Sequence, residues 1–335
     1  MTKYTNNAPT YHSELDIVDT STPDNGDNIS LADRQNFDNI LVLAERIGTL
    51  ANLTTTEKTN LVGAINELVS GKVSTSDIIA IAKGGTGAND ADSAVKNLFA
   101  SFTANAAFHN SLYRGKSLGT EVTQEQWDAI SAGTFDDMYI GDYWTINSRV
   151  YRIAAFDYWL HCGDTECTTH HIVLVPDANL YNAQMNGSNV TTGGYVGSEM
   201  YTSNLAAAKT TIKGDFNAAH ILSHREYLVN AVTNGRPSGG AWCDSDIELM
   251  NEHMVYGKHF EPASDGTNVP AIYTIDNAQL PLFALEHSRI CNRAYWWLRD
   301  VVSAAHFARV SGDGRCNDDG ASASLGVRPA FGIKA

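Results

Sequence analysis

Apolar and polar positions follow different rules in successive parts of the chain. Residues 1–28 are rich in Thr, Asn and Asp, and their apolar positions follow neither a helical nor a strand period. We interpret this segment as an extended arm that becomes ordered against a partner, because it offers too little apolar surface to form a core of its own.

Two helical patterns follow the arm. In the first, Ser30 and Asp33 resemble a capping box, and apolar residues then recur at spacings of three and four. These apolar residues are Phe37, Ile40, Ala44 and Ile47. In the second, Thr54 and Glu57 resemble a capping pair, and Gly71 suits a helix end. Its apolar stripe comprises Leu61, Ile65 and Leu68.

Both apolar stripes within residues 29–72 are narrow. A narrow stripe does not stabilise a short helix in isolation, so each helix needs a partner. Two arrangements meet this need: self-association around a threefold or twofold axis, and a helical hairpin packed on the rest of the same chain. We therefore treat this segment as a helical region for oligomerisation or attachment.

Residues 73–111 combine a glycine-containing linker with a short helix. Glycines at positions 84, 85 and 87 beside Lys83 suggest a phosphate-binding loop, but in that loop the lysine follows the glycines. We reject this interpretation. The glycines instead indicate a turn or joint, and the residues from Asn89 onward predict another short helix.

Residues 112–335 have the pattern of a compact mixed domain. The segment DYWTINSRVYRIAAFDYWL predicts a β-hairpin with Asn147 and Ser148 at its turn, and HHIVLVPD predicts a buried strand ended by Pro176. Helices are predicted for SNLAAAKTTIKGDF and for HILSHREYLVNAVTNG, the second ended by Gly235. Strands return in YWWLRD, HFARVSG and GVRPAFGI. This order predicts an α+β domain whose last strand rejoins the sheet.

The composition narrows the class of protein. The chain has 335 residues, of which 43% are hydrophobic and 18% charged, so it can bury a sizeable core. Its formal net charge of -15 argues against binding to nucleic acid or to an anionic membrane, because both need clustered Lys and Arg. No apolar run approaches the roughly 20 residues of a spanning helix, and the opening residues lack the pattern of a signal peptide. We expect a protein made in the cytoplasm without membrane insertion.

One segment, HCGDTECTTHH, contains residue types that bind zinc. They are His161, Cys162, Cys167, His170 and His171. The spacing is irregular and no second half-site accompanies it, so a polar loop with a hydrogen-bonded histidine is the favoured interpretation. The acidic segments DSDIELMNE and GDGRCNDDG do not match a calcium loop. We predict neither a metal nor another cofactor.

Five cysteines in a chain without a secretion signal predict free thiols. Cys291 and Cys316 raise the question of thiol chemistry, because a reactive thiol requires an electropositive environment. Arginines near them in the sequence are Arg289, Arg293 and Arg315. The chain has no G-x-S-x-G or H-E-x-x-H motif, so hydrolase chemistry has little support.

Arg299 and Arg328 lie inside apolar segments that predict strands. A guanidinium in such a place must be paired and hydrogen-bonded, and Asp300 or a backbone carbonyl could serve as the partner. We interpret both arginines as structural.

An ordered series of segments carries a family resemblance. The segments are GDYWTINSRVYRIAAFDYWL, HHIVLVPDANLYNAQMN, GGYVGSEMY, LVNAVTNGRPSGGAW, QLPLFAL and YWWLRDVVSAAHFARV followed by GVRPAF. Together they resemble the C-type-lectin-like domain of phage tail proteins that are diversified by diversity-generating retroelements in phages and prophages of gut Firmicutes. The resemblance covers about residues 112–335. Nearer the N-terminus, LTTTEKTNLVGAINEL and GGTGANDADSAVKNL are similar to segments common in phage tail and baseplate proteins.

The resemblance implies a variable segment at about residues 292–333. In such proteins an error-prone reverse transcriptase substitutes at template adenines, so asparagine codons become variable positions in a fixed frame. From Leu298 to Ile333 the chain has no Lys, Glu, Gln, Met or Trp, the types that an AAC codon cannot reach by changing its two adenines. The expected variable, outward-facing residues are Ala294, Tyr295, Trp296, His306, Arg309, Ser311, Asp313, Arg315, Asn317, Asp318, Asp319, Ala323 and Leu325.

The function implied by the resemblance is that of a non-enzymatic receptor-binding tail protein, located in the virion. Its lectin-like domain would bind a bacterial surface protein or glycan, and its N-terminal region would attach to tail or baseplate proteins. Trimeric display would raise avidity, although the sequence does not decide between a trimer and a dimer. A second class of protein also shares the broad lectin-like fold: formylglycine-generating oxidases, which use a cysteine pair, here Cys291 and Cys316.

Overall fold

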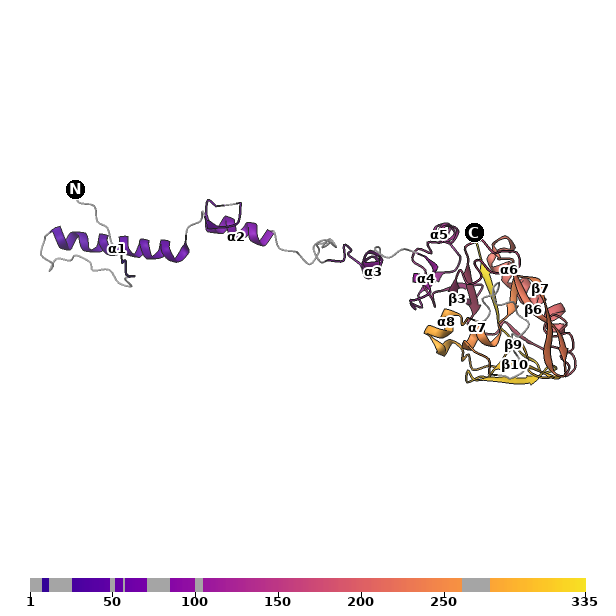
Figure 1. Ribbon diagram of the computed structural model, residues 1–335. Coiled ribbons are helices and arrows are strands. Elements are labelled where there is room, and N and C mark those ends of the chain that lie inside the picture. The colour runs from indigo at the N-terminus through magenta and orange to yellow at the C-terminus, as the bar shows by residue number, and fades with distance from the viewer. Residues whose placement is uncertain are drawn as a thin grey trace. The chain divides into compact units, whose positions relative to one another are not determined.

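The computed structural model describes residues 8–11, 26–48, 52–56, 58–70, 85–99, 105–260 and 278–335. The chain divides into two compact units, Met1–Leu98 and Phe99–Ala335, which we describe separately (Figure 1). Among the described residues, none of the helices combines the length and the apolar character needed to cross a bilayer.

The N-terminal unit begins its described structure with a long helix, α1, at Gly26–Ile47. The helix starts before Ser30, so the predicted capping box at Ser30 and Asp33 is wrong. The last three residues of the predicted arm, 26–28, belong to the helix. Most of residues 1–28 lies outside the described residues. The predicted apolar stripe is confirmed as a feature of α1, and its members Phe37, Ile40 and Ile47 are exposed in the single chain.

The second helix, α2, spans Leu61–Ser70. It begins later than the predicted cap at Thr54, because Asn60 supplies the cap: its Oδ1 accepts a hydrogen bond from the Gly63 amide at 2.7 Å. Gly71, predicted to end the helix, lies outside the described residues. The stripe of α2 is exposed as well, and it comprises Leu61, Ile65 and Leu68.

A short third helix, α3, spans Ala91–Phe99 and confirms the prediction of a helix after the glycines. Asp90 caps it by accepting from the Ser93 amide at 2.8 Å. The preceding turn is closed by Asn97, whose amide donates to the carbonyls of Thr86 and Gly87 at 3.1 and 3.0 Å. Residues 73–84 lie outside the described part of the chain.

The C-terminal unit is built on two mixed sheets. The six-stranded sheet has the order β1-β2-β3-β4-β13-β8. Its strands are β1 Ser117–Gly119, β2 Tyr143–Ile146, β3 Arg149–Phe156, β4 Ile172–Pro176, β8 Ile247–Leu249 and β13 Pro329–Ile333. The predicted hairpin is confirmed, since β2 and β3 pair antiparallel around Asn147 and Ser148, both with positive φ. The buried strand β4 and the return of the last strand to this sheet are confirmed too.

The second sheet has five strands in the order β11-β10-β9-β12-β5. Its strands are β5 Tyr181–Ala183, β9 Trp296–Val301, β10 His306–Val310, β11 Cys316–Gly320 and β12 Leu325–Val327. The predicted tail strands are therefore confirmed. No strand was predicted between HFARVSG and GVRPAFGI, but β11 forms there and pairs with β10 over its whole length.

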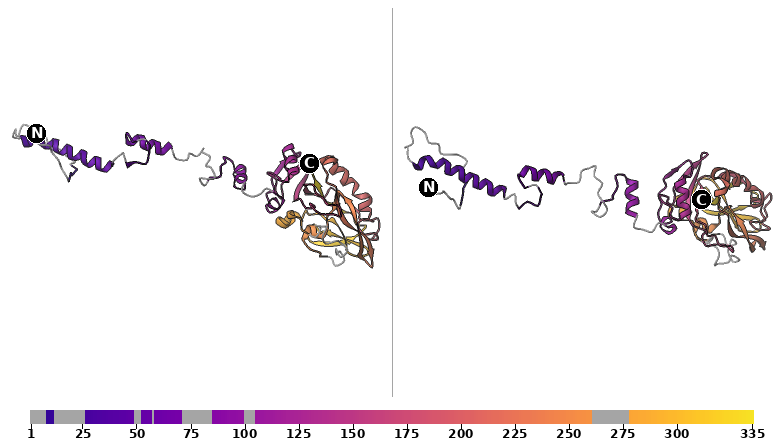
Figure 2. Two further views of the ribbon diagram at one scale, coloured as in Figure 1. Left: turned by 45° about the horizontal axis from the view of Figure 1, so that its top comes forward. Right: turned by 90° about the horizontal axis from the view of Figure 1, so that it is seen from above.

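Helices cover the sheets, which confirms the α+β class. They are α4 Ala106–His109, α5 Gln124–Ala132, α6 Ala206–Phe216, α7 Glu252–Tyr256 and α8 Pro281–Leu285. Short 3-10 turns, at Ala218–His220 and His287–Arg289, and a π-helical turn, at Met200–Asn204, join them. The chain ends beside α5 (Figure 2). There the Trp127 ring of α5 stacks on His220, and His220 contacts the Lys334 carbonyl.

One predicted helix is a β-hairpin instead. The segment expected to be helical up to Gly235 forms β6, His224–Thr233, which pairs antiparallel with β7, Arg236–Ser245. Asn234 and Gly235 both have positive φ and form the two-residue connection. An Asn-Gly pair favours this tight turn, and here it overrides the helical spacing of the apolar residues before it.

Two apolar clusters lie on the two faces of the second sheet. The first core contains Trp144, Tyr151, Trp296 and Phe331. The second core contains Tyr195, Trp297, Val301 and Phe307. Because neighbouring residues of a strand point to opposite faces, Trp296 and Trp297 belong to different cores. Strand β9 is thus buried on both of its faces.

The two structural arginines have different partners. Arg328, at the crossing from β12 to β13, donates from Nε to the Pro176 carbonyl at 2.7 Å and from Nη2 to the Arg289 carbonyl at 3.1 Å. This confirms the backbone-carbonyl prediction for Arg328. Arg299 pairs with Glu226 at 2.6 Å rather than with Asp300. Burial alone would raise the pKa of Glu226, but the charge of Arg299 lowers it to about 2.

Candidate functional site

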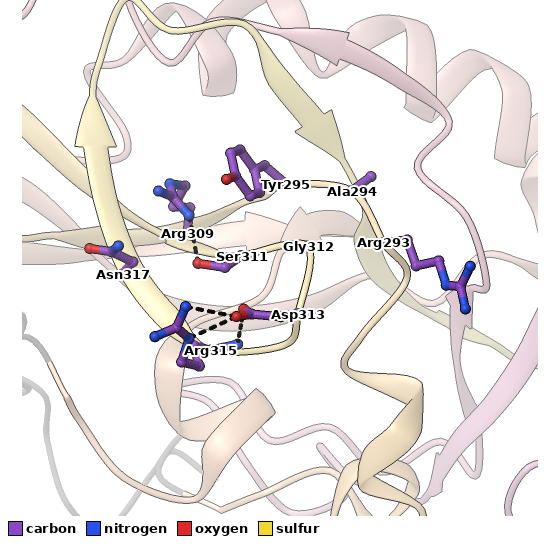
Figure 3. Close-up of a pocket in the computed structure, with 9 residues that line it drawn as sticks. All are labelled: Arg293, Ala294, Tyr295, Arg309, Ser311, Gly312, Asp313, Arg315 and Asn317. Atoms are coloured by element: carbon purple, nitrogen blue, oxygen red, sulfur yellow. Dashed lines mark hydrogen bonds and ion pairs between the residues drawn. The ribbon is translucent and has the colours of Figure 1, made fainter.

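A hollow of about 540 Å³ lies at the tip of the β10–β11 hairpin (Figure 3). We call it the tip hollow. It is lined by Arg293, Ala294, Tyr295, Arg309, Ser311, Gly312, Asp313, Arg315 and Asn317. These residues come from the entry to β9 and from the connected ends of β10 and β11, so two mostly buried strands and one edge strand hold its walls.

Strand register brings the lining residues together. Arg309 lies directly opposite Asn317 across the hairpin, so their side chains share a face of the sheet. The connection is closed by Ser311, whose amide donates to the Arg315 carbonyl at 2.8 Å. Gly314 has a φ of +88° within this connection, a conformation that favours glycine.

Arg309 forms the floor of the hollow and is only 8% exposed. Its Nε contacts Asp319 at 3.2 Å, and its Nη1 donates to the Ser311 hydroxyl at 2.8 Å. Its guanidinium lies over the Tyr295 ring, 4.3 Å from the centroid. Among the described residues, Arg309 Nη2 has no hydrogen-bond partner.

The rim of the hollow carries a second arginine. Arg315 contacts Asp313 at 2.8 Å, and both side chains are exposed, that of Arg315 to 82%. Hydrogen bonds from the Arg315 amide and guanidinium lower the pKa of the Asp313 carboxyl. The third arginine, Arg293, points away from the other lining side chains (Figure 3). Two guanidinium groups therefore border the hollow, one fixed and one in solvent.

The structure gathers most of the predicted variable residues at this hollow. Those that line it are Ala294, Tyr295, Arg309, Ser311, Asp313, Arg315 and Asn317. Asp319 joins them through its contact with Arg309. His306 and Asp318 pair with each other at 2.7 Å but lie on the opposite face of the hairpin, because residues of one strand alternate between faces. Ala323 packs, partly buried, against the second core.

Some predicted outward-facing residues point inward. Trp296 is fully buried in the first core, and Leu325 is 9% exposed and part of the second core. The expectation that they face outward is wrong, since β9 and β12 are interior strands of the sheet. Trp is also a type that an AAC codon cannot reach. Arg309 and Ser311 are largely buried, although both line the hollow.

Two residues of the hollow were absent from the predicted set. Arg293 and Gly312 line it beside the predicted Ala294 and Ser311. Arg293 adopts a φ of 61°, which is uncommon for a residue with a side chain. The only signal for Arg293 and Gly312 in the sequence was their position next to the predicted residues Ala294 and Ser311.

The His and Cys segment forms a hydrogen-bonded loop. His171 is buried, with its Nε2 accepting from the Trp159 amide at 3.0 Å and its Nδ1 in contact with the Thr169 carbonyl at 2.9 Å. Burial lowers the pKa of His171 to about 4. His170 contacts Asp157 at 2.8 Å. In the part of the chain that the structure describes, no three His, Cys, Asp or Glu side chains are arranged to hold a metal ion.

The five cysteines are free thiols, as predicted. The exposed Cys291 donates to the Gly312 carbonyl at 3.0 Å. Cys316 lies on the rear face of the hairpin, where its sulfur is 3.1 Å from Glu252 Oε1. The Glu252 carboxylate is one polar neighbour of Cys316, whereas reactive thiols lie beside cations.

An acidic pair lies behind the hairpin. The fully buried Glu252 begins α7, and its backbone amide donates to Asp300 Oδ2 at 2.7 Å. Its side chain contacts His259 at 3.0 Å in addition to Cys316. Burial and the charge of Glu252 raise the pKa of Asp300 to about 7. The rear of the hairpin is thus linked to the core through two carboxyl groups.

Residues 242–335 match a protein family described as a domain of unknown function, DUF6273. The match includes all of β9 to β13 and the whole tip hollow. It covers less than half of the chain, so it is a similarity of this segment. No curated protein and no solved structure matches the chain.

Proposed function

We propose that this chain is a phage tail receptor-binding protein whose C-terminal unit is a C-type-lectin-like domain. In this proposal the tip hollow is the centre of a diversified surface that binds a protein or glycan on the bacterial cell. The protein acts in the virion, at the tail tip or fibre, and its N-terminal region attaches to tail or baseplate proteins.

The observation that carries the proposal is the contrast between the hollow and its support. Its walls consist mainly of polar and aromatic side chains that belong to neither apolar core, and β9 and β10, which carry several of them, are mostly buried. A surface of this kind tolerates exchange of its side chains without loss of the fold, as adaptable binding surfaces require. Tyr, Arg, Ser and Asn are also residue types enriched in paratopes and interface centres.

The exposed stripes of α1 and α2 support self-association. Their apolar residues recur at spacings of three and four, the pattern of a coiled-coil seam, and they are exposed in the single chain. We propose that copies of this chain cover them, in a homotrimer that presents several hollows to one cell. Linking weak sites in this way raises avidity without new contacts.

The oxidase-like alternative depends on thiol chemistry rather than on the tip hollow. It requires Cys291 and Cys316 to act as a pair of reactive thiols. A thiol-dependent oxidation assay of the full chain, with Cys291→Ser and Cys316→Ser as controls, tests this alternative directly. Activity that is lost in both variants would replace the adhesin proposal.

Binding of the purified full chain to intact cells of gut Firmicutes tests the proposed function. The variant Arg315→Ala with Asn317→Ala removes two exposed side chains of the hollow. The matched control, Arg236→Ala with Asn230→Ala, removes the same two residue types from exposed positions on the β6–β7 hairpin. We expect the first variant to lose most of the binding and the control to retain it.

The size of the particle in solution is measured in parallel by light scattering. A trimer that falls apart in an Ile40→Asp and Ile65→Asp variant supports the assignment of the stripes. Equal cell binding by both hollow and control variants would move the receptor site away from the hairpin. A monomer at micromolar concentration would contradict the trimeric display.

A further inference from the structure

We infer that the tip hollow binds an anionic saccharide or polyol, through a single carboxylate or phosphate group placed between Arg309 and Arg315. This inference rests on the proposed function, because it names the chemical class of the receptor group at that same site. It follows from the hydrogen-bonding groups that the hollow leaves unused, from their charge, and from the charge of the whole chain.

The unused groups at the hollow are hydrogen-bond donors. Among the described residues, Arg309 Nη2 has no partner, and the Asn317 side-chain amide nitrogen has none either. The Ser311 oxygen accepts from Arg309, which leaves its hydroxyl hydrogen available. The nearby carboxylates are occupied, since Asp313 accepts from Arg315 and Asp319 from Arg309. A site rich in free donors requires a ligand rich in acceptors.

Arg309 is held for this role by the groups around it. Its side chain is about nine-tenths buried, and Asp319, Ser311 and the Tyr295 ring fix the guanidinium plane. A fixed guanidinium matches the geometry of a carboxylate or a phosphate. Because Arg309 is largely out of water, its contact with an anion is screened less than a contact on the open surface.

The rim supplies a second cation that can move. Arg315 is exposed and pairs with Asp313, also exposed, so an anion can take over part of this contact at little cost. Figure 3 shows the Arg315 side chain on the same side of the hollow as Asn317 and Ser311, whereas Arg293 points elsewhere.

The charge of the whole chain limits the ligand further. A formal net charge of -15 repels a dense polyanion at long range. Attraction at the hollow is local, and it acts on one isolated anionic group. The hydroxyl-rich remainder of a sugar or polyol suits the polar rim and the half-exposed Tyr295 side chain.

Titration of the full chain by ligand-observed NMR compares charged probes with neutral twins. Glucuronic acid is compared with glucuronamide, and glycerol 3-phosphate with glycerol. We expect at least one charged probe to bind roughly tenfold more tightly than its twin, since hydrogen bonds to charged groups are the stronger ones. The two pairs distinguish a carboxylate source from a phosphate source. Binding should weaken as salt is raised.

Three variants assign the contact. Arg315→Gln should weaken binding of the charged probe several-fold. Arg309→Lys keeps the charge but loses the planar guanidinium, so it should weaken this binding about tenfold. Arg236→Gln, at an exposed position of β7 outside the hollow, should bind as wild type does. Circular dichroism checks that Arg309→Lys remains folded, and the exposed Arg315→Gln keeps the test valid if it does not.

The inference is overturned if neither charged probe binds, if each neutral twin binds as tightly as its charged partner, or if Arg315→Gln binds like wild type. Its failure is separable from failure of the proposed function. Cell binding that depends on Arg315 and Asn317 without affinity for either charged probe would leave the adhesin proposal standing and remove the anion site. Binding of a charged probe without binding to any cell would leave the anion site standing and remove the adhesin proposal.

Discussion

The tip of the β10–β11 hairpin, residues 309–317, and the crossing from β12 to β13, residues 325–333, belong to one stretch of chain but differ in how they hold an arginine. Arg309 lies over the Tyr295 ring, and Arg328 lies over the Trp296 ring at 4.9 Å. Arg328 is 1% exposed, and burial lowers its pKa to about 10, so it remains charged at neutral pH.

The partners of the two guanidinium groups differ in kind. Arg328 is held by main-chain carbonyls of two other segments, which every sequence with this fold possesses. Arg309 is held by side chains near the hairpin tip, so its partners depend on which residues stand at those positions. We therefore expect tolerance to substitution to follow the type of partner more closely than the degree of burial.

We expect the largest difference in stability between Ala variants of two neighbouring aromatic residues, Trp296 and Tyr295. Trp296→Ala should lower the free energy of unfolding by about 3–5 kcal/mol, because it opens a cavity in the first core. Tyr295→Ala should cost only about 1 kcal/mol, chiefly the stacking on Arg309. Urea denaturation of the full chain measures both changes.

Trp296→Phe provides the graded control. It keeps most of the packing and removes an indole nitrogen that has no hydrogen-bond partner among the residues that the structure describes. We expect a cost below about 1.5 kcal/mol. Equal stability of the two Ala variants would mean that position 296 belongs to the exchangeable surface after all.

The next largest difference in stability is expected between Ala variants of two arginines, Arg328 and Arg315. Arg328→Ala should cost about 2–4 kcal/mol, because the Pro176 and Arg289 carbonyls lose their donor and a cavity remains between the sheets. Arg315→Ala, at the exposed rim, should change the stability by less than about 0.5 kcal/mol. Thermal unfolding followed by circular dichroism distinguishes them. If Arg328→Ala is as stable as Arg315→Ala, the cost of burying this charge cancels the gain from its hydrogen bonds.

The elements that the sequence pattern predicted correctly are those with a clear local signal. The β2–β3 hairpin has a short turn between alternating strands, and the continuous apolar run of β4 ends at Pro176. The β6–β7 hairpin was missed because its first strand also has the apolar spacing of a helix, and only the turn at Asn234 and Gly235 decides between them. Turn chemistry outweighed periodicity there.

The candidate site was predicted in part for a related reason. On a strand with one buried face, alternation shows which residues point outward, but β9 is buried on both faces and its apolar run carries no such information. Trp296 was therefore assigned to the surface together with Tyr295. The division of the hairpin into a front face with Arg309 and a rear face with His306 depends on the register of β10 and β11, which long-range packing fixes.

The smallest expected effect concerns the rear of the hairpin, where Asp300 lies beside Glu252. The pKa of Asp300 is raised to about 7 in the folded protein and has its ordinary acidic value in the unfolded chain, so the folded state holds the proton more tightly. The stability that this provides is complete below about pH 4 and is lost as the pH rises through about 7. Asp300→Asn cannot lose a proton. It should therefore gain about 1–2 kcal/mol relative to wild type between pH 5 and 8, a modest value because Asp300 is partly exposed.

Asp313→Asn, at the tip, is the matched control for Asp300→Asn. The pKa of Asp313 is lowered by its hydrogen bonds to Arg315, so its contribution is present above its ordinary value and fades only as the pH falls below about 4. Its unfolding curves should run parallel to those of wild type between pH 5 and 8. Chemical denaturation at a series of pH values measures the three proteins, and pH effects shared with other groups such as His171 cancel in the differences. Parallel curves for Asp300→Asn and wild type would show that Asp300 is ionised across this range, and the rear of the hairpin would then resemble its solvent-exposed tip.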